Sequence, residues 1–339
     1  MSHKLQTAQK TFVFNLNPAN DTDVAENSKI IDIGQCASLV NRYSARQGYE
    51  YFVQSIEIGV KGGGAFEAAI FRLPEHWPCI NAWEKVMRHW DHQQRDAAEE
   101  AGVESTRAEY RDFKIFFDGE HANAGAGANL IPDGYSVTAP ATGGYQWNPS
   151  QVVLPNGGGP GVTTELYLHM LGPDNAGANP SAGMIQAYAE SRSRPFEDDP
   201  NVVDVLMGGL LGQMENVGGD MGEIVNNLQD HNRQPPYLID NDTADEYYPG
   251  GSNQGDQGFN YRGSFLDILA VNANQNYNTD SMGGFVAPCG LIKINYNATN
   301  VNVSGVPAAG DMPFGIYLKM ILAPGHYKGL AARPMKDVN

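Results

Sequence analysis

Residues 314–323 read Phe-Gly-Ile-Tyr-Leu-Lys-Met-Ile-Leu-Ala, and this stretch decides the fold class. An extended strand would place every second side chain on one face, and here those side chains are all apolar: Phe314, Ile316, Leu318, Met320 and Leu322. A helix would scatter the same residues around its axis. The stretch therefore predicts a β-strand with one apolar face, which a second layer of structure must cover.

Similar runs occur before and after this strand and far upstream of it. They lie at residues 11–16, 29–34, 49–60, 65–73, 111–118, 151–154, 165–171, 264–271, 291–296 and 326–334. Regular alternation of strands and helices, as in βαβ units, is not visible. We therefore predict a mainly β protein, an antiparallel eight-stranded jelly-roll sandwich with long loops and a few inserted helices, forming a single domain over residues 1–339.

Two parts of the chain have the composition of loops, namely residues 119–162 and residues 195–260. The first is rich in Gly, Pro, Ala and Asn, and the second contains an acidic segment rich in Gly and Asn. We expect both to be outward-facing insertions in the sandwich. Short helices are predicted near residues 202–211 and 222–232 within the second insertion.

The clearest predicted helix covers residues 81–101, with Asn81 as its N-cap and Glu84 three positions later. A shorter helix of one or two turns is predicted over residues 36–42. Residues 183–191 are compatible with a strand or a helix, and we favour a strand because Gly and Pro flank them. Residues 264–271 are apolar at successive positions, which is typical of a buried central strand.

The composition indicates a large core and many turns. The chain is 41% hydrophobic and contains 39 Gly and 20 Pro. No run of about eighteen apolar residues is present, so we expect no membrane insertion, and the polar residues 1–10 lack the apolar segment of a signal peptide. The three cysteines are odd in number and far apart, so we expect each to be a buried free thiol: Cys36, Cys79 and Cys289.

Motifs of catalysis are missing from the sequence. It contains no Gly-x-Ser-x-Gly, no Walker sequence and no phosphate-binding Gly-rich loop before a helix. His89 and His92 share a helix face, but no third metal ligand accompanies them, and we interpret them as solvent-facing. We therefore predict that the protein is not an enzyme.

Five segments give the chain a family resemblance: residues 36–48, 73–77, 81–85, 112–118 and 285–292. In these segments the chain resembles the jelly-roll capsid proteins of a group of viruses known from environmental samples. These viruses have small circular single-stranded DNA genomes that encode a Rep protein. The resemblance implies a subunit that is made in the host cell and assembles with copies of itself into an icosahedral virion shell around single-stranded DNA. The chain departs from many members of this group in its first 28 residues, which contain only two Lys or Arg residues where those members have an Arg- and Lys-rich arm.

The charge is unevenly distributed along the chain. Residues 115–260 carry a net charge of −16, compared with −3 for residues 1–114 and +2 for residues 261–339. Because acidic surfaces repel DNA, we expect the middle third to face outward and the two ends to face a genome. The nucleic-acid-facing candidates are Lys4, Lys10, Arg42, Arg46, Arg333 and Lys336.

So few basic residues predict weak direct DNA binding. Tyr43 or Tyr49 could add base stacking, and polyamines or Mg²⁺ would supply most of the neutralisation. For each basic residue the alternative is pairing with a local carboxylate.

An acidic cluster suggests a cation site. Its members are Asp240, Asp242, Asp245 and Glu246. Carboxylates from several subunits that meet would need protons or Ca²⁺ or Mg²⁺ to relieve their repulsion. A solvated acidic loop is the alternative, and an EF-hand is excluded because the run lacks the Gly and the closing Glu of that loop.

Aromatic residues are the candidate anchors of subunit contacts: Trp77, Trp83, Trp90 and Trp147. For Trp83 and Trp90 the alternative is ordinary packing of a helix on a sheet, which we favour. Two other functions remain open. One is a jelly-roll module that binds glycans or a host-surface receptor, using Tyr247 and Tyr248. The other is an enzyme on a double-stranded β-helix, for which no His-x-Asp/Glu pair on a strand is present.

Overall fold

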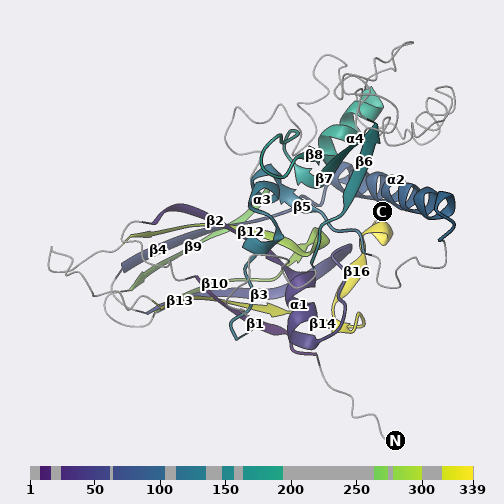
Figure 1. Ribbon diagram of the computed structural model, residues 1–339. Coiled ribbons are helices and arrows are strands. Elements are labelled where there is room, and N and C mark those ends of the chain that lie inside the picture. Colours follow the sequence, from purple (N-terminus) through teal and green to yellow (C-terminus); the bar gives the residue numbers. More distant parts are fainter. Residues whose placement is uncertain are drawn as a thin grey trace, which may run out of the picture. The chain divides into compact units, whose positions relative to one another are not determined.

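The computed structural model describes residues 8–16, 24–61, 64–103, 112–134, 147–155, 163–193, 263–273, 278–299 and 315–338. The chain is mainly β with antiparallel sheets, as the sequence predicts (Figure 1). It divides into two compact units, whereas the sequence analysis predicted one domain. Unit 1 contains Met1–Leu73, Gly127–Tyr145 and Ser264–Asp337, and unit 2 contains Pro74–Ala126, Gln146–Gly263 and Val338–Asn339.

The first sheet of unit 1 is built around the strand that the sequence identified first. Its strands are antiparallel and follow the order β1 (Thr11–Asn15), β13 (Gly315–Leu322), β3 (Tyr49–Lys61) and β10 (Asn278–Met282). Leu318 lies opposite Phe14 on one side and Ile58 on the other. Two short strands, β11 (Phe285–Ala287) and β16 (Ala332–Pro334), also pair with β3.

The second sheet of unit 1 has the order β2 (Val24–Asp32), β12 (Leu291–Thr299), β4 (Gly64–Arg72) and β9 (Ser264–Ala273), again antiparallel. Side chains from both sheets form one continuous apolar cluster, so the two sheets are the layers of a sandwich. The alternation in β13 is confirmed at its four described positions, which are all buried: Ile316, Leu318, Met320 and Leu322.

Short elements connect the strands at one end of this sandwich. Helix α1 (Ile33–Asn41) links β2 to β3, and the 3-10 helix η6 (Pro288–Gly290) links β11 to β12. After β13 come the two-residue strands β14 (Pro324–Gly325) and β15 (Gly329–Leu330), then β16 and the 3-10 helix η7 (Met335–Asp337). The predicted return run over residues 326–334 is therefore a small hairpin followed by a strand that joins β3 and not β13.

The prediction for residues 264–271 is wrong in one respect. They form β9, but β9 is the edge strand of its sheet and not a central one. Leu269 and Val271 face the core, whereas Phe265 and Ile268 are 52% and 46% exposed. The carboxylate of Asp280 on β10 accepts a hydrogen bond from the Ala270 N–H at 3.1 Å, which occupies a backbone donor of this edge.

Unit 2 combines a small mixed sheet with helices. Strand β7 (Thr163–Leu171) pairs with β5 (Phe116–Asp118) and β8 (Ser181–Gly183) in parallel and with β6 (Gln151–Pro155) in antiparallel fashion. The helices are α2 (Trp77–Glu100), α3 (Gly119–Ala124) and α4 (Met184–Ser193), and the 3-10 helix η2 (Ala126–Ala128) follows α3 in the chain. None of the described helices is long and apolar enough to cross a membrane.

Three sequence predictions for unit 2 need correction. Helix α2 begins at Trp77 and not at Asn81, because Pro78 is tolerated in a first turn and His76 takes the N-cap position. Residues 184–193 are a helix and not a strand, since four apolar side chains at helical spacing are buried: Met184, Ile185, Ala187 and Tyr188. Of the described residues 112–118 in the predicted strand 111–118, only 116–118 are a strand, and Phe113 and Ile115 are buried side chains on irregular backbone.

The predicted insertion over residues 195–260, with both of its helices, lies outside the described residues. In the other predicted insertion, residues 119–162, the described parts include α3, η2 and β6.

Candidate nucleic-acid interface

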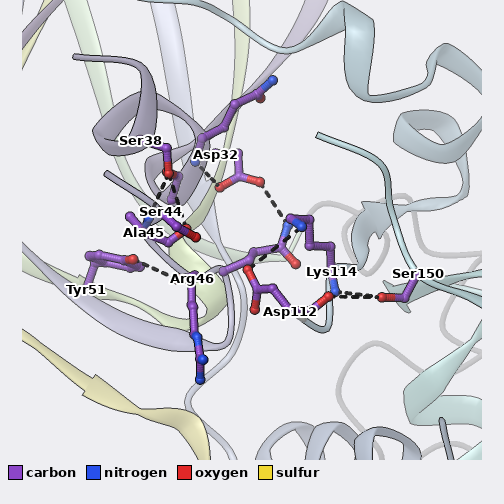
Figure 2. Close-up of polar contacts among 12 residues, drawn as sticks. Asp32, Ser38, Ser44, Ala45, Arg46, Tyr51, Asp112, Lys114 and Ser150 are labelled. Carbon is purple, nitrogen blue, oxygen red and sulfur yellow. Dashed lines mark hydrogen bonds and ion pairs between the residues drawn. The ribbon is translucent and has the colours of Figure 1, made fainter. Parts of the chain in front are cut away.

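The connection between α1 and β3 carries Arg42 and Arg46 and is tied down along its length. The Ser38 hydroxyl donates to the Gly34 carbonyl at 2.7 Å and accepts from the Ala45 N–H at 2.8 Å. The Tyr51 hydroxyl donates to the Arg46 carbonyl at 2.6 Å. Figure 2 shows these contacts, with the Arg46 side chain extended away and no dashed contact at its guanidinium. The backbone of residues 42–47 is therefore held, while its long basic side chains are not.

Asp32, the N-cap of α1, also fixes the end of this loop through a hydrogen bond to Gln47. One carboxylate oxygen of Asp32 accepts from the Gln35 N–H at 3.1 Å, and the other accepts from Gln47 Nε2 at 2.9 Å. Asp32, Gln35 and Gln47 are all buried. A single buried carboxylate thus fixes both the start of the helix and the end of the loop.

The β14–β15 hairpin supplies a third cation from the other end of the chain. Tyr327 and Leu330 exchange two backbone hydrogen bonds, of 3.0 and 2.9 Å. Between them Lys328 has φ 51° and Gly329 has φ 92°. Positive φ at both central residues is the mark of a type I′ turn, which normally prefers Asn-Gly.

The hairpin contacts the α1–β3 connection through rings and polar groups. The rings of Tyr49 and Tyr327 stack with centroids 4.0 Å apart, and the Tyr327 hydroxyl accepts from the Arg46 N–H at 3.0 Å. Lys328 Nζ donates to the Ser44 carbonyl at 2.6 Å and lies 5.3 Å from the centroid of the Tyr43 ring. We call this assembly the loop–hairpin cluster: Arg42, Tyr43, Arg46, Tyr49, Tyr327 and Lys328.

The loop–hairpin cluster is a cationic surface. Arg42, Arg46 and Lys328 are exposed, and none of them forms an ion pair with another residue in the described part of the chain. Burial, and then the neighbouring Tyr327, raise the pKa of Tyr43 to about 12, so its hydroxyl stays neutral and adds no negative charge.

Two of these cations occupy positions where the backbone favours glycine or asparagine. Arg42 is the C-cap of α1 at φ 55°, and Lys328 is the first central residue of its turn at φ 51°. The described part of the chain has only one other non-glycine residue with positive φ, Cys289. Each such position costs about 1 kcal/mol relative to glycine. Both costs therefore fall on exposed basic side chains.

No protein-family model, curated protein or solved structure matches this chain. Three exposed cations beside aromatic rings, on a fixed backbone, suit an anionic polymer such as nucleic acid.

Other predicted nucleic-acid-facing residues lie on elements next to this cluster in unit 1. Lys10 follows Gln9, whose N–H donates to Asn41 Oδ1 at the end of α1 (2.7 Å). Lys336 is exposed on η7, which is joined to the loop where the Met335 N–H donates to the Gly48 carbonyl (3.1 Å).

Arg333 is half-exposed and forms an ion pair with the buried Glu50, which is the local pairing that the sequence left open. Lys4 lies outside the described residues. Tyr327 and Lys328 were missed, although the Lys-Gly pair between two strand-like runs is a recognisable turn signal.

The predicted cation site stays a prediction, because its members lie outside the described residues: Asp240, Asp242, Asp245 and Glu246. Within the described ranges, no group of three or more His, Cys, Asp or Glu side chains could hold a metal ion. On α2, His92 Nδ1 lies 2.9 Å from Asp96 Oδ2 on an exposed face, in keeping with the solvent-facing interpretation.

The four candidate interface tryptophans all lie in unit 2 and all contact other side chains of the same unit. Trp83 and Trp90 are buried against Phe113, with ring centroids 5.9 and 5.3 Å apart. Both side chains therefore pack within unit 2, although Phe113 lies on irregular backbone and not on a strand as the predicted helix-on-sheet packing would require. Trp77 meets Tyr188 edge-on, and Lys114 lies over the Trp147 ring. The latter two are only partly buried and so retain surface for a subunit contact.

One His–Ser pair in unit 2 was not predicted from sequence. His169 Nδ1 lies 2.9 Å from the Ser181 hydroxyl, and Nε2 lies 3.0 Å from the Pro173 carbonyl. Because a carbonyl only accepts, Nε2 carries the proton and Nδ1 accepts from Ser181. Burial lowers the pKa of His169, and the carboxylates of Asp174 and Asp118 oppose that shift. With both residues at most 1% exposed, we assign this pair a structural role in joining β7 to β8.

The cysteine prediction is confirmed. Cys36, Cys79 and Cys289 are free and buried. Burial raises the pKa of Cys79 to about 12, and burial together with Asp32 raises that of Cys36. Such thiols are inert while the surrounding structure is intact.

Proposed function

We propose that unit 1 is a jelly roll and that the protein is a viral capsid subunit. The observation that carries this proposal is the order of its strands. Counted along the chain, the strands β1, β2, β3, β4, β9, β10, β12 and β13 form one sheet in the order 1-8-3-6 and the other in the order 2-7-4-5. Two Greek keys wrapped face to face produce this order.

The place of unit 2 in the chain supports the same proposal. It occupies the connection between β4 and β9, the fourth and fifth strands of the sandwich. A jelly roll tolerates long insertions at such connections because the sheet pairing does not pass through them. In a shell subunit, insertions of this kind supply surface for contacts between copies.

The distribution of charge supports single-stranded DNA as the cargo. Unit 1 gathers both ends of the chain, which carry the loop–hairpin cluster, whereas residues 115–260 carry the net charge of −16. We propose that the ends face the genome inside the virion and that the acidic middle third faces outward. The role is structural and not enzymatic, which agrees with the burial of the His169–Ser181 pair.

Electron microscopy and light scattering of the purified full chain test this function. We expect closed particles of uniform diameter under some condition of salt and pH. A chain that stays monomeric under every condition would overturn the proposal. In the particles, a density map in which residues 8–10 and 326–336 lie on the outer surface would overturn the assigned orientation.

A further inference from the structure

We propose that the loop–hairpin cluster binds the phosphate backbone of single-stranded DNA through Arg42, Arg46 and Lys328, by charge and without base stacking. The identity of the ligand rests on the proposed function. The site itself rests on its geometry: three exposed cations, from sequence positions nearly three hundred residues apart, are brought onto one fixed piece of backbone.

Two of the three cations lie at positive φ, a backbone conformation that disfavours them. Glycine at the end of α1 and asparagine in the hairpin turn would fit positive φ better than Arg42 and Lys328 do. A long cation at a position that disfavours it needs a compensating role. For Arg42, the folded chain provides none through an ion pair with any described residue.

The three cations keep N–H groups that could donate hydrogen bonds to an anion. Lys328 Nζ uses one N–H on the Ser44 carbonyl, which fixes its position and leaves two N–H groups for an anion. Each guanidinium offers five more. Because the loop backbone is already held by Ser38, Tyr51 and Gln47, little ordering is needed when phosphate binds.

The aromatic rings of the cluster contact one another and Lys328. Tyr49 and Tyr327 stack on one another, and Lys328 lies over Tyr43 and Tyr327. These contacts engage one face of the Tyr49 ring and one face of the Tyr43 ring within the protein, which limits the base stacking that the sequence suggested for the two residues. Binding should therefore be independent of base and strongly dependent on salt.

The test measures binding of a fluorescent oligothymidylate to the full chain as a function of salt. Arg42→Gly and Lys328→Asn each remove a charge while improving the local backbone fit. Each lost phosphate contact lowers the slope of log K against log salt by about 0.7, so the double variant should lose about 1.4. Its melting temperature should be unchanged or higher. Lys328→Arg, which keeps the charge, should retain binding.

The matched control is the double variant Arg88→Gln and Arg95→Gln, which removes two charges from exposed side chains of α2 in unit 2. It should keep the wild-type slope. Equal loss in both double variants would mean that net charge and not this site determines binding, and would overturn the inference. Wild-type protein that does not bind the oligonucleotide would overturn it as well.

An abasic oligonucleotide of equal length tests the absence of stacking. We expect equal affinity, whereas a stacking site would lose about tenfold or more per base. Failure here is distinguishable from failure of the proposed function. Protein that forms shells without binding DNA overturns only the inference, and protein that binds DNA through this cluster but never assembles overturns only the capsid proposal.

Discussion

On β3, an inner strand of unit 1, Ile58 lies between Leu318 of β13 and Asp280 of β10, with its side chain in the apolar cluster between the sheets. On β7, an inner strand of unit 2, His169 lies opposite Phe116 of β5 and Gly183 of β8, with its ring hydrogen-bonded to a buried serine. The buried polar residues Asp32 and Gln47 of unit 1 belong to the α1 connection and not to the space between the sheets. Both units bury apolar side chains, but only unit 2 has described buried histidines, so the stability of unit 2 should carry a contribution that depends on pH in the range where histidine titrates.

The largest loss of stability is expected from a cavity between the two sheets of unit 1. Leu318→Ala removes a fully buried side chain between the sheets and should lower the free energy of unfolding of unit 1 by about 3 kcal/mol. Urea denaturation measures the loss, which should be the same at neutral pH and near pH 5. The control is Lys319→Ala on the outer face of the same strand, where the partly exposed pair with Glu57 predicts a loss of at most about 1 kcal/mol. A loss for Leu318→Ala that depends on pH would contradict the contrast between the units.

The next effect is steric and belongs to unit 2. A Cβ on Gly183 would lie 2.2 Å from the Gly172 carbonyl oxygen, which is backbone and cannot swing away, and 3.4 Å from His169 Nε2. Gly183→Ala should therefore destabilise unit 2 by about 1–3 kcal/mol. Gly127→Ala, at the boundary where the chain enters unit 1 and a Cβ meets open space, is the control for the substitution itself and should be nearly neutral. Equal stability of the two variants, measured by thermal unfolding, would show that β8 shifts freely.

The contrast between the units also explains which parts of the fold could be predicted. In unit 1, alternation of apolar residues identifies a strand even when its partners are distant, as for residues 314–323. For β9, apolar residues predicted the strand but not its position at the edge of the sheet. The sequence does not show whether an apolar side chain such as Ile268 faces a neighbouring layer or solvent. In unit 2, α4 was mistaken for a strand because ten residues between Gly and Pro signals hold too few turns to reveal a helical period.

The loop–hairpin cluster could be predicted only in part. Arg42 and Arg46 were predicted because residues 1–114, with a net charge of −3, are much less acidic than residues 115–260, with −16. The contact of Arg46 with Tyr327 spans 281 positions, and no local pattern encodes such a distance. The pairing of Arg333 with Glu50 follows from the register of β16 on β3, which sequence alone does not fix.

A smaller effect is the response of unit 2 to acid. Burial lowers the pKa of His169 in the folded state below its value of about 6.5 in the unfolded chain. The unfolded chain therefore takes up the proton more readily. The contribution of His169 to stability is complete above about pH 6.5 and declines as the pH falls below that value toward the lowered folded pKa. Unit 1 has no buried histidine among its described residues, so its stability should not fall in this pH range for this reason.

The cysteines allow this difference to be measured within one chain. Cys79 lies in unit 2, and Cys36 and Cys289 lie in unit 1. As the pH falls to about 5, labelling by a pyridyl disulfide, which reacts in acid, should accelerate at Cys79 and not at Cys36. In His169→Gln the acceleration between neutral pH and pH 5 should shrink. Labelling that accelerates equally at all three thiols would show that acid acts on the whole chain.

The smallest effects are expected at the surfaces, where the two units should behave alike. Lys319 and Glu57 pair across β13 and β3 at 3.0 Å, and Arg95 pairs with Asp91 on α2, also at 3.0 Å. All four side chains retain contact with water, so each pair should contribute only about 0.3–0.5 kcal/mol. Double-mutant cycles with Glu57→Gln and Lys319→Gln, and with Asp91→Asn and Arg95→Gln, isolate the two coupling energies. Both should vanish in about 1 M salt, where charges separated by more than about 3 Å are screened. A coupling of several kcal/mol that persisted in salt for one pair would mean that this pair is desolvated and stabilises its unit. The two units would then differ at their surfaces as well as in their cores.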